Sequence, residues 1–217
     1  MANLKEIRNR ISSVGSTMQI TSAMKMVSAA KLKRAQDAIT QMRPYASKLK
    51  EILTNLSASL DLSDNAYSEA RDSGTVLIVG VTSNRGLCGG FNNNVIKRVN
   101  ELIKDEFSGH DVHVLCLGKK IRDVIKRTDY HYTNDYLEAR EDVYADLTFD
   151  NVAEVAEELM RLFKSGEFSK ICVVYNRFVN AATQVVESEQ FLPVQSPENE
   201  ESNQAGDYIF EPSKDSI

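Results

Sequence analysis

The sequence predicts an α/β protein in which a long N-terminal coiled-coil helix precedes a Rossmann-like domain with a mostly parallel sheet. Two observations support this fold class. Apolar residues recur at alternating spacings of three and four through residues 4–60, which is the heptad pattern of a coiled coil. Between residues 74 and 195, short apolar runs alternate with helical patterns, as in βαβ units. The chain is accordingly divided into a coiled-coil helix at 1–60, a linker at 61–73, an α/β domain at 74–195, and an acidic loop with the start of a further helix at 196–217.

The long helix is defined by its heptad seam. With Leu4 at position a, fourteen of the seventeen a and d residues are apolar, and the polar ones are Thr21, Lys25 and Ser28. A repeat of period 3.5 over eight heptads predicts a left-handed supercoil, and at 1.5 Å per residue the helix would be roughly 85 Å long. Pro44 falls at an outer position, where it would kink the helix without touching the seam.

A seam of this length must meet another helix. No segment of comparable length follows it, so we expect the partner helix to come from a second copy or from outside these 217 residues.

The outer positions of this helix change character in one place. They are mostly polar elsewhere, but between residues 20 and 30 they are apolar, and we call these outer residues the collar: Ile20, Ala23, Met26, Val27 and Ala30. An exposed apolar patch marks an interaction site, and methionine adapts to partners of different shape. The pattern favours contact with other chains, although packing on the protein's own α/β domain would also explain it.

The charges are divided unevenly along the chain. Residues 1–60 carry ten Lys and Arg against three Asp and Glu, a net charge of +7, and the remainder carries 16 against 28, a net charge of −12. Such asymmetry suggests a polyanionic partner for the basic helix, either nucleic acid or an acidic protein surface. A solvated helix face explains the same charges without any partner.

Several classes of protein are disfavoured by composition. We expect neither export nor membrane insertion, because there is no signal-peptide pattern and no window near the roughly 18 apolar residues of a membrane span. Cys88, Cys116 and Cys172 lie far apart, and two of them fall in strand-like runs, which predicts reduced thiols in the cytosol. We expect no metal and no cofactor.

The α/β domain follows from three strand–helix cycles. The run 75–82 predicts a buried strand, the turn "SNRGLCGG" follows it, and "FNNNVIKRVNELIKDEF" has helical spacing. The second cycle is "VHVLCLG" and "KKIRDVIKRT", and the third is a helix with Asp150 as its N-cap followed by "KICVVYNRF". The alternating run "ATQVVESEQFLPV" predicts an edge strand.

The glycine-rich turn resembles a phosphate-binding loop only in composition. It matches neither Gly-x-Gly-x-x-Gly nor the P-loop pattern, so we interpret Gly86, Gly89 and Gly90 as a tight turn that needs unusual dihedral angles. No catalytic set is recognisable either, since the three histidines lack metal-ligand spacing and there is no Gly-x-Ser-x-Gly. Catalysis by this chain alone is therefore not expected.

Four stretches, in this order and spacing, resemble the γ subunit of bacterial F-type ATP synthases: "KEIRNRISSVGSTMQITSAMKMVSAAKLKRAQ", "RPYA", "RGLCGGFN" and "DYIFEP". The resemblance covers the whole chain. It implies a central rotor stalk that couples rotation of the c-ring to conformational changes at the catalytic β subunits, with α, β, ε and c subunits as partners. It also implies a peripheral position at the cytoplasmic face of the bacterial inner membrane, and a non-catalytic role for this subunit.

The resemblance carries roles to particular residues. Thr21, Ala23, Met24, Lys25, Met26 and Val27 match the segment that faces β-subunit loops, and Lys31, Lys33 and Arg34 would lie near acidic levers of β. Tyr208, Phe210 and Glu211 match the foot region close to ε and the c-ring, and the three glycines of the turn belong to the family signature.

Family members continue into a long C-terminal helix, whereas this sequence stops at "PSKDSI". We therefore expect a truncated chain. The alternative function is a basic coiled-coil adaptor for nucleic acid, which is weakened because Tyr45 is the helix's single aromatic residue and stacking platforms are absent. A nucleotide-dependent enzyme is a third possibility, opposed by the absent phosphate motif.

Overall fold

The computed structural model describes residues 3–59, 66–71, 73–138 and 143–194. The chain divides into two compact units, one at Met1–Leu56 and the other at Ser57–Ile217. The predicted acidic loop and further helix at 196–217 lie outside the described residues, as do Tyr208, Phe210 and Glu211.

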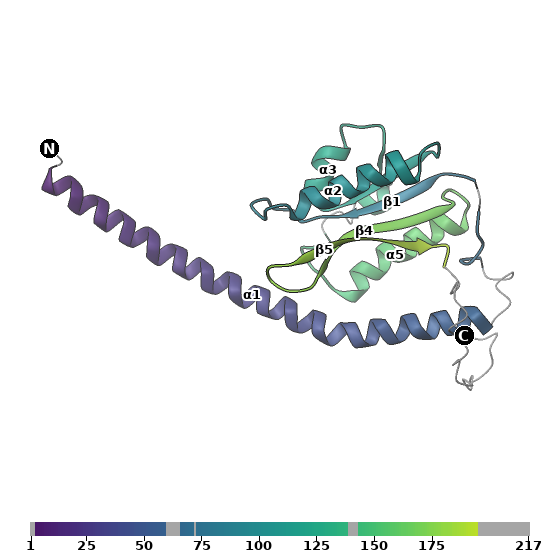
Figure 1. Ribbon diagram of the computed structural model, residues 1–217, viewed down its shortest axis with the longest axis horizontal. Coiled ribbons are helices and arrows are strands. Elements are labelled where there is room, and N and C mark those ends of the chain that lie inside the picture. The colour runs from purple at the N-terminus through teal and green to yellow at the C-terminus, as the bar shows by residue number, and fades with distance from the viewer. Residues whose placement is uncertain (1–2, 60–65, 72, 139–142, 195–217) are drawn as a thin grey trace. The chain divides into compact units, whose positions relative to one another are not determined.

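The first unit is a single helix, α1 (Leu4–Ser59), of 56 residues. Asn3 caps its start, since the Asn3 side-chain oxygen accepts from the Lys5 amide at 3.2 Å and the Asn3 carbonyl accepts from the amides of Glu6 and Ile7. The helix continues through Pro44, and its axis bends in the last third of its length, the part that contains this proline (Figure 1). The predicted long helix is thus confirmed.

The second unit is built on a five-stranded sheet of order β3-β2-β1-β4-β5. Its strands are β1 (Val76–Val81), β2 (Val112–Leu117), β3 (His131–Tyr132), β4 (Lys170–Phe178) and β5 (Gln184–Leu192). The first four run parallel, and β5 is an antiparallel edge strand. The Rossmann-like, mostly parallel sheet is confirmed, while the two-residue strand β3 was not predicted.

Helices cover both faces of this sheet (Figure 1). On one side lie α2 (Phe91–Glu101), which continues as the π-helix η2 (Leu102–Glu106), and α3 (Lys119–Ile125). On the other lie α5 (Phe149–Lys164) and the short α4 (Asp135–Glu138). The order β1-α2-β2-α3-β3 fills one direction of the sheet and α5 returns to the far side of β1, as in doubly wound folds.

Each face has its own apolar core. The α2–α3 face buries Ile78, Val95, Val99, Val114 and Ile121, and the α5 face buries Leu77, Val79, Leu159, Leu162 and Phe163. Consecutive residues of β1 therefore enter opposite cores, which explains why this strand is apolar throughout rather than alternating.

One predicted cap is wrong. Thr148, not Asp150, is the N-cap of α5, because the Thr148 backbone is extended and its hydroxyl accepts from the Asn151 amide at 3.3 Å. Asp150 instead occupies the first turn, where a carboxylate is favoured by the helix dipole.

The described part of the predicted linker, residues 66–71, is bound to the α/β domain. The amide of Val194 donates to the carbonyl of Tyr67 at 2.8 Å. Arg71 donates to the carbonyls of Phe163 and Phe168 at 2.8 and 3.3 Å, and its guanidinium lies 4.6 Å from the centroid of the Phe163 ring. These contacts join Tyr67 and Arg71 to the α/β domain.

Substitution of two glycines can test how closely the backbone after β1 approaches the backbone after β2. Gly118 and Gly109 both have positive φ, of 111° and 91°, but a Cβ at Gly118 would lie 2.1 Å from the carbonyl oxygen of Thr82 whereas one at Gly109 would meet nothing within 4 Å. Gly109→Ala should cost about 1 kcal/mol of backbone strain, and Gly118→Ala at least about 3 kcal/mol. Amide hydrogen exchange of the β1 and β2 strands in the two variants measures this difference, and equal losses would contradict it.

Candidate functional site

The residues that sequence reasoning singled out on the long helix all lie in the exposed middle of α1. Thr21, Ala23, Lys25, Lys31 and Arg34 are exposed, as are the larger apolar side chains of this stretch. Met24, Met26 and Val27 are 64%, 67% and 58% exposed, and Ile20 of the collar is 62% exposed. These side chains are exposed on α1, as are nearly all the described side chains of this helix, so that their contact with other chains stays a prediction.

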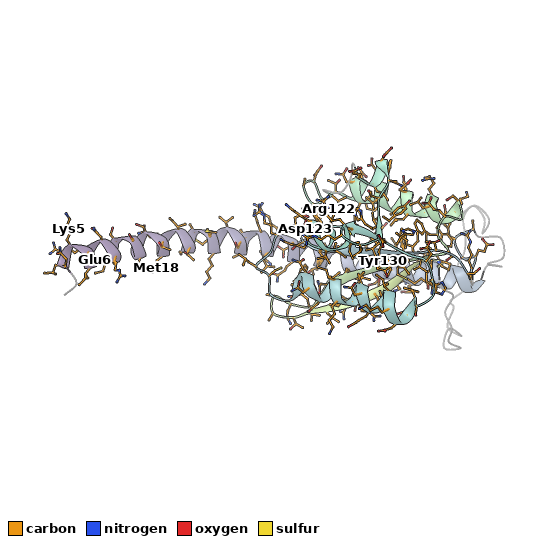
Figure 2. The ribbon with its side chains drawn as sticks, turned by 90° about the horizontal axis from the view of Figure 1, so that it is seen from above. Lys5, Glu6, Met18, Arg122, Asp123 and Tyr130 are labelled. Atoms are coloured by element: carbon orange, nitrogen blue, oxygen red, sulfur yellow. The ribbon has the colours of Figure 1, made fainter. Side chains whose placement is uncertain are left out.

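The seam of α1 is exposed as well. Leu4, Ile11, Val14 and Met18 all rank among the exposed large apolar residues, and Figure 2 shows Met18 as a side chain that projects from the helix. Since the collar occupies the outer positions, α1 is apolar on the seam and on its outer face around residues 20–30. A helix with this distribution needs partners on more than one side to cover it.

Local hydrogen bonds reduce the cost of covering the polar seam position Thr21. Its hydroxyl donates to the carbonyl of Thr17 at 2.8 Å, and the Thr17 hydroxyl donates to the carbonyl of Ser13 at 2.9 Å. Because both hydroxyl protons are satisfied within the helix, an apolar partner can contact this stretch without leaving a buried donor unpaired. A shallow depression of about 500 Å³ is lined by Thr17 and Thr21 together with Val14, Met18, Ser22 and Lys25.

The basic residues follow one turn later. Lys33 forms an ion pair with Asp37 at 2.8 Å, and both side chains are more than half exposed. An ion pair in such a position contributes little to stability and leaves the surface open to an acidic partner. Apolar contact and positive charge are therefore adjacent along α1.

The glycine-rich turn differs from its prediction in detail. Of Gly86, Gly89 and Gly90, only Gly89 has a positive φ, of 58°, while Gly90 is the N-cap of α2 with φ of −77°. The other left-handed residue of the turn is Leu87, with φ of 61° and a fully exposed side chain. Unusual dihedral angles are thus required at Gly89 but not at Gly86 or Gly90.

Asn92, which sequence reasoning missed, organises this turn. It is 6% exposed, and its side-chain oxygen accepts from the Ser83 amide at 2.9 Å and the Ser83 hydroxyl at 3.0 Å. Its amide nitrogen donates to the Arg85 carbonyl at 3.2 Å and to the Cys88 sulfur at 3.0 Å. The turn is therefore closed by bonds within itself.

The end of β4 is fastened to the same region. Asn176 of β4 donates from its side-chain nitrogen to the carbonyl of Phe91, the first residue of α2, at 2.8 Å. This contact spans the crevice between β1 and β4, where Rossmann-like sheets bind nucleotides. The Lys119 amide is likewise taken by the side chain of Asn84 at 2.9 Å. The Asn84 bond takes up one backbone amide at this edge, whereas the Asn176 bond takes up a carbonyl, which a phosphate would not contact.

The thiols and acidic groups of the described part of the chain form no recognisable reactive centre. Cys116 and Cys172 are buried in strands, and burial raises the pKa of the Cys116 thiol to about 12 and that of Cys172 to about 11. Both pKa values keep these thiols protonated at neutral pH, whereas Cys88 is exposed in the turn. No group of three or more His, Cys, Asp and Glu side chains is placed to hold a metal ion within residues 3–59, 66–71, 73–138 and 143–194.

Among the helices of the described residues, none is long and apolar enough to cross a membrane. The surface features of the described residues are then a partly apolar, basic helix and a sheet domain in which Asn176 bridges β4 and α2 at the usual binding crevice. Together these define a subunit of a larger assembly, in which the long helix is covered by other helices or chains.

Comparison with known proteins identifies the assembly. A sequence model of the family described as ATP synthase matches residues 3–217. The chain is 57% identical to the ATP synthase gamma chain of Flavobacterium johnsoniae, with all of this chain and 74% of that protein aligned. It is 44% identical to the gamma chain of Cytophaga hutchinsonii, again over all of this chain and 75% of that one. The chain therefore belongs to the ATP synthase gamma chain family.

Solved structures agree on the fold. The central stalk and c-ring structure of the Tetrahymena thermophila mitochondrial ATP synthase contains a chain that matches with a TM-score of 0.56 and 23% identity, covering 80% of this chain and 72% of that one. The rotor of the Euglena gracilis mitochondrial ATP synthase contains one that matches with the same TM-score and identity, covering 87% and 62%.

The role of Asn92 can be tested against its neighbour Asn93, which is exposed on the same turn of α2. Asn92→Ala should cost about 2 kcal/mol, because it leaves the amide of Ser83 without its partner and removes the bond that Asn92 donates to the Arg85 carbonyl. Asn93→Ala should change stability by less than about 0.5 kcal/mol. Hydrogen exchange of the α2 amides in the full chain gives both values, and a similar loss in the two variants would show that the turn does not depend on Asn92.

Proposed function

We propose that this chain acts as the central rotor stalk of a proton-translocating F-type ATP synthase. In this role it couples rotation of the c-ring to conformational changes at the catalytic β subunits and makes no bond itself. Its asymmetric shaft biases each β site among states of different nucleotide affinity, which is a coupling free energy between distant sites. The observation that carries the proposal is α1, a 56-residue helix with an exposed apolar seam and an exposed collar.

The proposed contacts to β occupy the middle of α1. Seam and outer positions in this stretch would be covered at once by a partner helix and by β-subunit loops, which explains apolar residues on both sides. The proposed apolar and polar contacts are Thr21, Ala23, Met24, Lys25, Met26 and Val27. The exposed cations Lys31, Lys33 and Arg34 would face acidic segments of β, because opposite charges steer and orient such contacts.

The remaining assignments are proposals as well. Tyr208, Phe210 and Glu211 would contact ε and the c-ring, and α subunits would surround the shaft together with β. The chain would sit peripherally at the cytoplasmic face of the bacterial inner membrane and reach that membrane only through the c-ring. It would need no cofactor, because catalysis belongs to β.

Met24→Lys tests whether this part of α1 transmits force. Met24 is 64% exposed on the free helix, so the substitution should change the free energy of unfolding by less than about 0.5 kcal/mol. In the assembled ATP synthase the new ammonium would be pressed against apolar partner groups, and the protons pumped per ATP hydrolysed should fall at least about twofold. Proton uptake and ATP hydrolysis by the same membrane vesicles give this ratio.

The control is Gln41→Lys, which adds the same charge at an exposed position of α1 outside the collar. It should leave the ratio of protons to ATP unchanged. If both variants couple as well as the parent complex, or if both lose coupling equally, the surface around Met24 is not the transmission surface.

The non-catalytic role is tested on the purified chain. We expect no ATP hydrolysis above the rate without protein, because the glycine-rich turn matches no phosphate-binding pattern and the described residues place no group of three or more His, Cys, Asp and Glu side chains to hold a metal ion. A coupled assay of phosphate release measures this rate. Hydrolysis that is abolished by substituting one of the chain's own residues would overturn the proposal, whereas hydrolysis that persists in every variant comes from a contaminant.

A further inference from the structure

A depression of about 390 Å³ lies at the amino ends of β1 and β4, the opposite edge of the sheet from the nucleotide crevice of Rossmann-like folds. Val76 begins β1 and Lys170 begins β4, and both line it. Phe107 and His110 contribute from the turn after η2, and Gln190 from the end of β5. Its volume is within the range of small-molecule sites.

The floor of this depression is apolar. Val76 and Phe107 are 2% and 4% exposed. The Phe107 amide donates to the carbonyl of Leu102 at 2.8 Å, the five-residue bond of a π-turn. Such turns insert one extra residue into a helix and recur at functional sites. Here the inserted residue turns the aromatic ring under the side chain of Lys170.

The rim of the depression is mainly cationic. The Lys170 ammonium lies 5.5 Å from the centroid of the Phe107 ring, and the His110 ring meets the same phenyl ring edge-on at 6.3 Å. Arg71 also lines the depression, although its guanidinium already holds two carbonyls and Glu69. The carboxylate of the rim, Glu106, lies 3.5 Å from Arg98 and is thereby partly neutralised.

Lys170 is the cation of this rim that is available for a ligand. Within the described residues no carboxylate lies within 4.0 Å of its ammonium nitrogen, and the contact recorded for that nitrogen is with the Phe107 ring. The neighbouring Ser169 is 7% exposed and donates its hydroxyl proton to the Thr75 carbonyl at 3.1 Å, so that the hydroxyl oxygen retains lone pairs but no free proton. The recognition of negative charge therefore depends on Lys170, and the neighbouring His110 ring can add a hydrogen bond.

We propose that this depression binds a small organic anion that combines a flat apolar body with a carboxylate or phosphate group. The body would lie on the apolar floor above Phe107 and Val76. The anionic group would bind the Lys170 ammonium by a charge-assisted hydrogen bond and accept a further hydrogen bond from the His110 ring. The site is separate from α1 and independent of the proposed rotor function, so either one can fail without the other.

The test is a titration of the full ¹⁵N-labelled chain with phenyl phosphate, followed by amide chemical shifts. We expect saturable shifts of the Phe107, His110, Ser169 and Lys170 amides, with a dissociation constant of about 1 mM or below. Inorganic phosphate, which lacks the ring, should bind at least about fivefold more weakly at the same amides. Sodium benzoate should bind there too, since it keeps the ring and an anionic group.

Lys170→Gln should weaken phenyl phosphate binding at least about tenfold, because it removes the charge and keeps a side chain of similar length. Lys104→Gln is the matched control, since Lys104 is an exposed lysine of η2 that does not line this depression. His110→Gln, in an exposed turn, provides a second variant if Lys170→Gln alters the spectrum beyond the depression. Equal weakening by Lys104→Gln, shifts confined to the basic α1, or no saturable shift at these four amides would each overturn the proposal.

Discussion

A single helix cannot bury its own side chains, and this constraint governs the whole of α1. Stable helices in proteins owe most of their stability to the packing of an apolar face. α1 has such a face along its seam and a second one in the collar, and its described side chains leave both of them largely in water. α1 therefore suits an environment supplied by other helices, and the positions of its apolar residues indicate where those helices would pack. Where the seam alone is apolar one neighbour suffices, and where the collar is added the helix must be surrounded.

The α/β domain differs from α1, because its apolar side chains and its polar groups find their partners within the domain itself. β1 is buried on both faces between α2–α3 and α5, and the loops at its carboxyl end are closed by the side chains of Asn84, Asn92 and Asn176. In enzymes of similar topology, the carboxyl edge of the sheet is left open and its backbone amides remain free to bind a ligand. Here the side-chain oxygens of Asn92 and Asn84 accept from the amides of Ser83 and Lys119, and the side-chain nitrogen of Asn176 donates to the Phe91 carbonyl. One fold can therefore serve as a rigid body when its polar groups are used internally.

The sequence predicted the large elements and failed on short or long-range ones. Eight heptads and three strand–helix cycles are strong periodic signals, so α1, the parallel order and the edge strand β5 were predictable. β3 has two residues and α4 has four, which is too short for any periodicity to show. The π-turn of η2 is invisible because its residues still fit a helical pattern. The contact from Asn176 to Phe91 joins residues 85 positions apart, and no local sequence pattern around either residue predicts it. The contact residues proposed on α1 stay a prediction, because nearly every described side chain of this lone helix is exposed and exposure does not distinguish them.

The antiparallel direction of β5 decides how the chain leaves the α/β domain. β1 and β4 start at one edge of the sheet, and β5 returns the chain to that edge, where the amide of Val194 binds the carbonyl of Tyr67. The entrance and the exit of the domain are therefore hydrogen-bonded to each other. In topological terms the domain is an insertion, because the chain enters it near Tyr67 and leaves it near Val194, and these two residues are hydrogen-bonded to each other. Its size and its loops can change during evolution without separating Tyr67 from Val194, because the hydrogen bond between these two residues does not depend on what lies between them.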